Sequence, residues 1–198
     1  TLEEVVSRTY LVKEKPDAIL NIIDGTNIER NLYLTMQLME LDTPMVLALN
    51  MMDEVTSGGG TIDVKGMSKA LGIPVVPISA VKNQGVDELI RIAVATAKSR
   101  TYPAVYDFCT PGPVHRCIHA VVHQIEDHAE ASGIPVRFAA TKLIENDPDI
   151  RERLELDQNE LELIEHSVQE METDCGMDRN AALADMRYNF IESVCRTT

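Results

Sequence analysis

The sequence is poor in basic residues. Eighteen Lys and Arg stand against 32 Asp and Glu in 198 residues, which gives a formal net charge of −14 and a pI near 4.7. A surface of that sign repels phosphate backbones and anionic lipid headgroups. We therefore expect that the chain binds no nucleic acid and has no polybasic membrane patch.

Long apolar runs and a basic leader are also missing. No apolar run approaches the roughly 20 residues that cross a bilayer, and the polar start Thr1-Leu2-Glu3-Glu4 is unlike a signal peptide. The chain does not begin with Met, and Thr1 and Glu4 have the spacing of a helix capping box. We therefore expect the chain to begin inside folded structure and to be part of a longer protein.

Cysteine is scarce and irregularly spaced. The four cysteines are Cys109, Cys117, Cys175 and Cys195. Because no C-x-x-C spacing occurs among them, they are typical of reduced thiols in a cytosolic compartment.

Charge divides the chain into two parts. Residues 1–101 carry 10 basic and 13 acidic groups, net −3, whereas residues 102–198 carry 8 and 19, net −11. We predict two domains, residues 1–102 and 103–198.

The first part alternates short apolar runs with amphipathic segments. Strands are expected at residues 18–23, 45–49 and 75–78, and Pro77 indicates an edge or an irregular rung for the third. Helices are expected between and after them, at 28–41, 62–71 and 86–97, with a flexible loop at 56–60. This order predicts an α/β fold in which a parallel sheet is flanked by helices.

The second part contains helical patterns and no convincing strand. Apolar residues from Val114 to Ile125 recur at helical spacing along one stripe. Further helices are expected at 135–144, from Asp157 to Gly176, and after Asp178. We predict an acidic, all-α helical bundle of about four helices.

Ligands bind α/β sheets at the carboxyl ends of the strands. Asn50 and Asp53 follow the second predicted strand, and Ser79 and Ala80 follow the third. In nucleotide-binding folds this combination binds guanine: a carboxylate accepts from N1–H and the exocyclic amine, the amide contacts N7, and a backbone N–H near Ala80 donates to O6. Met51 would pack its thioether against the base.

Asn-x-x-Asp alone has little specificity. Two further copies occur, Asn21 to Asp24 along a strand and Asn146 to Asp149 in a loop or helix cap. The alternative for Asn50 and Asp53 is likewise a turn and a helix cap.

Longer stretches carry a family resemblance. Residues 21–35 (NIIDGTNIERNLYLT) followed by 47–53 (LALNMMD) closely resemble the cytoplasmic GTPase domain of ferrous-iron transport protein B (FeoB). VVPISA at 75–80 with Gly85 resembles that family's guanine-recognition loop, and PVRFAATKL at 135–143 resembles its helical domain. The resemblance is dense over residues 18–90 and thinner after Tyr106.

The resemblance implies a partial P-loop-GTPase-type sheet that binds GTP or GDP. The phosphate-loop pattern G-x-x-x-x-G-K-[ST] does not occur, and Gly58-Gly59-Gly60 lacks the Lys and Ser/Thr. We expect the phosphate loop, the switch and the Mg²⁺ site to precede Thr1. The chain alone is therefore predicted to be inactive as a GTPase.

For the whole protein, the resemblance implies coupling of GTP binding and hydrolysis to Fe(II) uptake at the cytoplasmic face of the bacterial inner membrane. The transmembrane pore, expected after Thr198, would be its partner within the same parent chain. A homo-oligomer is compatible with the sequence.

Three histidines suggest a metal site. His115, His119 and His123 lie at i, i+4 and i+8 of one predicted helix, near Cys109. We favour the alternative that they form a solvated helix side with Glu126 and Glu130, and we predict no metal site.

Two other functions remain open. One is an RNA- or ribosome-associated GTPase with the same two loops, which the net charge disfavours. The other is a non-enzymatic helical interaction or metal-sensing module, in which the α/β part serves as a scaffold.

Overall fold

A computed structural model describes residues 10–105 and 107–198. The chain forms two compact units, residues 1–106 with 191–198, and residues 107–190. Because this division groups residues by spatial contact, the domain boundary between residues 102 and 103 stays a prediction. The capping box at Thr1 and Glu4 lies outside the described residues.

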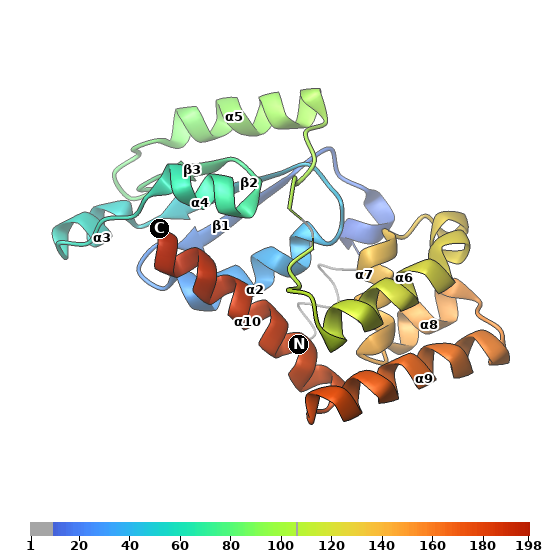
Figure 1. Cartoon of the computed structure of the whole chain (residues 1–198). Coiled ribbons are helices and arrows are strands. Elements are labelled where there is room, and N and C mark those ends of the chain that lie inside the picture. Colours follow the sequence, from blue (N-terminus) through green and yellow to red (C-terminus); the bar gives the residue numbers. More distant parts are fainter. Residues whose placement is uncertain (1–9, 106) are drawn as a thin grey trace. The chain divides into compact units, whose positions relative to one another are not determined.

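The first unit contains a three-stranded parallel sheet (Figure 1). Its strands are β1 (Ile19–Asp24), β2 (Met45–Asn50) and β3 (Val75–Pro77), in the order β1-β2-β3. Ile19 pairs with Met45 and Asp24 with Asn50, so the ends of β1 and β2 are level. This confirms the predicted parallel sheet, with Pro77 in a strand that pairs only with β2 among the described residues.

Helices connect and flank these strands. They are α2 (Ile28–Met39), α3 (Met52–Ser57), α4 (Val64–Leu71) and α5 (Val86–Ser99). Residues 45–49 of β2 are fully buried, as expected for a strand covered on both faces. On the α5 side, Val46, Ala48 and Val76 pack with Leu89 in one apolar cluster.

The prediction of a flexible loop at residues 56–60 is partly wrong. Thr56 and Ser57 belong to α3, which backbone hydrogen bonds such as Gly58 to the Glu54 carbonyl extend, and their hydroxyls donate to the Met52 and Glu54 carbonyls. Gly58 then caps it.

The second unit is the predicted all-α bundle. Its helices are α6 (Pro113–Ser132), α7 (Val136–Ile144), α8 (Pro148–Leu154), α9 (Gln158–Cys175) and the first part of α10 (Arg179–Thr197). Helix α6 packs against α7, α8 and α9 and buries the predicted stripe, including Ile118, Val121 and Ile125. The described residues 107–190 contain no strand.

The sequence did not predict α8. This seven-residue helix follows Asp147, whose carboxylate accepts from the Asp149 and Ile150 amides, with Pro148 in its first turn. At this length it has too few apolar positions to produce a periodic pattern.

Across the part of the chain that the structure describes, no helix is both long and apolar enough to cross a membrane.

Candidate functional site

The first half of the candidate site is the turn after β2. Asn50 is the last residue of β2, Met51 adopts a left-handed conformation (φ 62°), and Asp53 lies in the first turn of α3. The Met52 amide donates to the Ile78 carbonyl at 3.2 Å, which fixes this turn to the loop after β3. The backbone therefore presents Asn50 and Asp53 on the same side as that loop.

A glycine also permits this turn to approach β1. The Gly25 amide donates to the Asn50 carbonyl at 2.9 Å, and a Cβ on Gly25 would lie 2.8 Å from the same oxygen. Only glycine fits this approach without a shift of the backbone. The sequence prediction did not include Gly25.

The second half of the site is the loop after β3. Ser79 and Gln84 exchange two backbone hydrogen bonds of 3.0 Å, which close residues 80–83 into a tight turn. Gly85 ends this turn with φ 74°, and a Cβ there would lie 2.4 Å from the Pro77 carbonyl oxygen. A side chain at position 85 would therefore be strained and would also clash.

Side chains join the two halves. The Ala80 amide donates to Asn50 Oδ1 at 3.0 Å. The Ser79 hydroxyl, which is buried, accepts from the Lys82 amide at 3.3 Å. Lys82 Nζ also lies 3.4 Å from Asp53 Oδ2.

These contacts set the charge of Asp53. The hydrogen bond from Ser79, followed by the contact with Lys82, holds the pKa of Asp53 below its usual value. The carboxylate stays ionised at neutral pH and can accept hydrogen bonds from a ligand. Lys82 was not predicted as a site residue, although a Lys in the five residues between Ser79 and Gly85 was the available signal.

The structure thus brings Asn50, Met51, Asp53, Ser79 and Ala80 together at one end of the sheet. The two other Asn-x-x-Asp copies have structural roles. Asn21 is buried and donates to Thr35 Oγ1 at 2.7 Å, while Asp24 accepts from the Thr26 amide. Asn146 to Asp149 spans the start of α8, as the loop and cap interpretation predicts.

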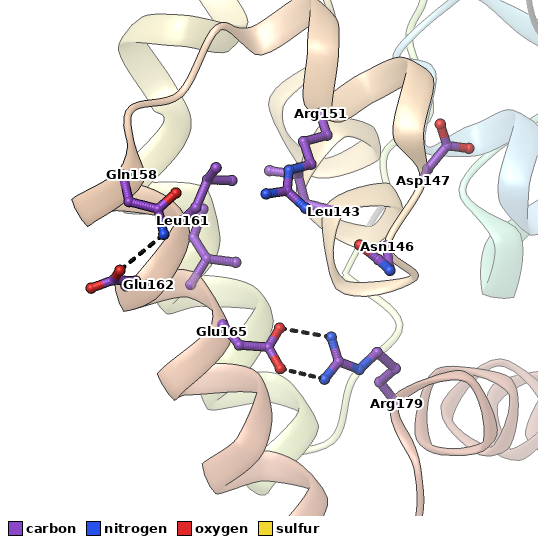
Figure 2. Close-up of a pocket in the computed structure, with 10 residues that line it drawn as sticks. Leu143, Asn146, Asp147, Arg151, Gln158, Leu161, Glu162, Glu165 and Arg179 are labelled. Atoms are coloured by element: carbon purple, nitrogen blue, oxygen red, sulfur yellow. Dashed lines mark hydrogen bonds and ion pairs between the residues drawn. The ribbon is translucent and has the colours of Figure 1, made fainter.

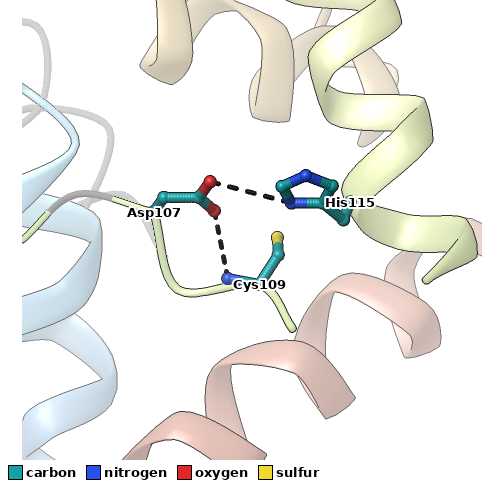
Figure 3. A group of neighbouring side chains, drawn as sticks. All are labelled: Asp107, Cys109 and His115. Atoms are coloured by element: carbon teal, nitrogen blue, oxygen red, sulfur yellow. Dashed lines mark hydrogen bonds and ion pairs between the residues drawn. The ribbon is translucent and has the colours of Figure 1, made fainter. Parts of the chain in front are cut away.

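The predicted histidine row is divided by the structure. His123 is exposed, whereas His115 and His119 are half-buried and face Asp107. Asp107, Cys109 and His115 form a group of potential metal ligands (Figure 3). Burial raises the pKa of the Cys109 thiol to about 11, so the thiol is neutral at physiological pH. The solvated-side interpretation therefore describes only His123 among the three.

A pocket of about 460 Å³ lies among α7, α8 and α9 (Figure 2). Its most prominent charges are already paired, because Arg179 donates to both Glu165 oxygens at 2.7 and 2.9 Å and also contacts Glu172. The two carboxylates raise the pKa of Arg179 further. These charges stabilise the fold and offer little to a ligand.

Comparison with known proteins identifies both parts of the chain. Residues 1–93 match the family described as ferrous iron transport protein B, and residues 111–198 match the FeoB cytosolic helical domain. The Fe(2+) transport protein A/Fe(2+) transporter FeoB fusion protein of Porphyromonas gingivalis is 32% identical over 206 residues. That alignment covers 99% of this chain and 24% of the relative. The Fe(2+) transporter FeoB of Salmonella typhimurium is 40% identical over 89 residues, which cover 45% of this chain and 12% of the relative.

Solved structures of the same family are similar to this chain over its whole length. An NFeoB mutant from S. thermophilus bound to GDP has a TM-score of 0.91 and 35% identity, covering 100% of this chain and 75% of that one. The mGMPPNP-bound NFeoB from S. thermophilus has a TM-score of 0.85 and 36% identity, covering 100% of this chain and 73% of that one. The chain therefore belongs to the FeoB family and comprises G-domain and helical-domain sequence of its cytoplasmic region.

Proposed function

We propose that this chain recognises guanine nucleotides within the cytoplasmic region of a ferrous iron transporter. Asn50, Met51, Asp53, Ser79 and Ala80 would form the guanine-binding site. The observation that carries this proposal is the join between the two loops, in which Asn50 Oδ1 accepts from the Ala80 amide and Lys82 Nζ lies 3.4 Å from Asp53 Oδ2. The GDP and mGMPPNP bound to the similar NFeoB structures support the same ligand class.

The chemistry of the site favours guanine over adenine. An ionised Asp53 can accept from N1–H and the exocyclic amine of guanine, a pair of adjacent donors that adenine lacks. We expect the exposed Ala80 amide, which donates to Asn50 Oδ1 in the structure, to donate to O6 when a base binds. Met51 would cover one face of the base.

The phosphates and Mg²⁺ need other residues. Asp53, the site's carboxylate, is engaged by Ser79 and Lys82, and the pattern G-x-x-x-x-G-K-[ST] is missing from the 198 residues. This donor set fits a base edge and does not fit a Mg²⁺–phosphate site. The chain by itself would therefore bind GTP weakly and would not hydrolyse it.

For the whole protein, we propose that the guanine-nucleotide state is coupled to Fe(II) uptake. This chain spans about a quarter or less of the two transporters compared above. The transmembrane pore of the same parent chain would be the partner, at the cytoplasmic face of the bacterial inner membrane. An RNA-associated GTPase is less consistent with the net charge of −14.

Ligand-observed NMR on the 198-residue chain tests the base site directly. Millimolar guanosine, adenosine and xanthosine are compared by saturation transfer, and guanosine should give the strongest effect. Asp53→Asn should reverse the preference toward xanthosine by about 10- to 100-fold, because a charge-assisted hydrogen bond is worth about 1.5–3 kcal/mol.

Asp149→Asn is the matched control, because Asp149 ends an Asn-x-x-Asp copy that lies at a helix start. It should leave the guanosine preference unchanged. An Asp53→Asn chain that still prefers guanosine would exclude the proposed site. In proteoliposomes that contain a complete transporter, the same substitution should make Fe(II) uptake depend on xanthine nucleotides if the coupling is as proposed.

A further inference from the structure

A second group of chemically active side chains lies in the helical unit, outside the proposed guanine site. We propose that Asp107, Cys109 and His115, joined by His119, bind one first-row divalent transition metal ion. We call these four residues the Asp107 cluster. The proposal stands on the helical unit alone and does not depend on nucleotide binding.

The donor atoms of the Asp107 cluster converge. One ligand atom each from Asp107, Cys109 and His115 lies within 4.8 Å of the others. Figure 3 shows the three side chains next to one another. They offer one oxygen, one sulfur and one nitrogen. This mixed set suits Zn²⁺, Co²⁺ or Fe²⁺, whereas Mg²⁺ and Ca²⁺ prefer oxygen ligands alone.

His115 supplies an observation that points to a ligand. Its Nδ1 is buried and has no hydrogen-bond partner among the described residues, although Asp107 Oδ2 lies 3.7 Å away. Burying a ring nitrogen without a hydrogen-bond partner destabilises the fold, and a metal ion bound at this position would remove that cost. The histidine therefore has an unused ligand atom directed toward the carboxylate.

His119 can complete the cluster. It lies one turn after His115 on α6, its ring centroid is 4.2 Å from that of His115, and its Nε2 is 3.1 Å from Asp107 Oδ2. Two histidines at i and i+4 on a helix can bind one ion. Because α6 is packed against α7 and α9, both rings are carried by a fixed element.

The carboxylate of Asp107 divides its partners between its two oxygens. Oδ1 accepts from Arg137 Nη2 at 3.1 Å and from the Cys109 amide at 3.2 Å. Oδ2 faces His115 and His119. Arg137 therefore holds the carboxylate and leaves Oδ2 for the ion.

Arg137 also limits affinity. Its Nη2 lies 3.5 Å from Cys109 Sγ, so its positive charge is close to the bound ion. On binding, a sulfur–metal bond forms and the Cys109 thiol proton passes to solvent, without oxidation or reduction. The alternative is an ion-pair network that binds no metal, and the experiment has to separate the two.

Titration of the untagged 198-residue chain with Co²⁺ tests the proposal. A cobalt–cysteine bond produces an intense near-ultraviolet charge-transfer band, so one equivalent of Co²⁺ should produce it and Zn²⁺ should displace it. Cys109→Ser should remove the band, and His115→Ala should weaken binding by about 100-fold or more, the upper end of the loss seen for outer-shell changes.

His123→Ala and Cys175→Ser are matched controls, because they remove the same ligand types outside the cluster. Both should bind Co²⁺ like the unchanged chain, and circular dichroism establishes that each variant is folded. The proposal would be overturned if the unchanged chain gave no saturable band. It would also be overturned if Cys109→Ser and His115→Ala bound Co²⁺ as tightly as the unchanged chain. Since these two substitutions lie on different elements, either one can report if the other fails to fold.

Discussion

Asp53 in the α/β unit and Asp107 in the helical unit show how the surroundings of one side-chain type change its use. Asp53 is held by the Ser79 hydroxyl and by Lys82, whose side chain is more than half exposed. Asp107 contacts a guanidinium, two imidazoles and a backbone amide. The first carboxylate can still accept from neutral donors such as the edge of a base. The second is held through Oδ1 by Arg137, while its Oδ2 faces two imidazoles that can share a metal ion with it.

The backbone around the two carboxylates differs as well. Asp53 is placed by hydrogen bonds between main-chain atoms at the ends of strands, whereas Asp107 is placed mainly by side-chain contacts of α6 and α7. We therefore expect the first site to be most sensitive to backbone changes and the second to loss of charge.

The largest effect should come from Gly85→Ala. Position 85 has φ 74°, and the added Cβ would lie 2.4 Å from the Pro77 carbonyl oxygen. Left-handed strain costs about 1–2 kcal/mol and the clash adds to it, so we expect a loss of about 2–4 kcal/mol in the free energy of unfolding. Urea titration measures this loss.

Gly59→Ala separates strain from clash. Gly59 has a similar φ of 78°, but no atom of the described residues lies within 4 Å of the position of its added Cβ. It should cost only about 1 kcal/mol. Equal losses at positions 59 and 85 would show that the contact with Pro77 does not hold the loop after β3.

The way in which each site is held together determines how much of it the sequence could predict. Parallel strands end at one edge of a sheet, so Asn50 and Ser79 could be brought together from their positions after two predicted strands. Gly25 and Gly85 require the observed backbone approach before their role is evident. The residues contacting Asp107 could not be grouped, because Cys109 lies in an irregular loop and Arg137 is 30 residues away on another helix.

A smaller effect should follow from Asp107→Asn. The substitution leaves Arg137, whose side chain is only 11% exposed, without its carboxylate partner. Loss of a partner from a half-buried ion pair should cost about 1–2 kcal/mol of unfolding free energy after allowance for solvent screening.

Asp53→Asn is the comparison variant for that measurement. Its ion-pair partner Lys82 is exposed, so the urea midpoint should change little while the base preference changes strongly. If Asp53→Asn destabilised the chain as much as Asp107→Asn, the distinction between a carboxylate with an exposed ion-pair partner and one with a mostly buried partner would be wrong.

The smallest effect concerns pH and His128 in the helical unit. Its Nδ1 lies 2.8 Å from the Leu154 carbonyl oxygen and its Nε2 lies 3.0 Å from Glu160 Oε1. Both ring nitrogens face acceptors, so the doubly protonated form makes both hydrogen bonds, and the contact with Glu160 raises the pKa of His128 above 6.5. Its stabilising contribution is complete below the unfolded pKa and is lost as pH rises through the folded pKa.

The melting temperature of the unchanged chain should therefore fall as the pH rises above about 6.5, the unfolded pKa of histidine. His128→Gln should remove most of that slope, because glutamine has no titrating ring. Asp53 cannot supply the slope, since its pKa is lowered and its contribution changes only in acid. If the slope survived in His128→Gln, another group would cause the pH dependence. The contrast between a helical unit stabilised by titrating pairs and an α/β site stabilised by its backbone would then lose this support.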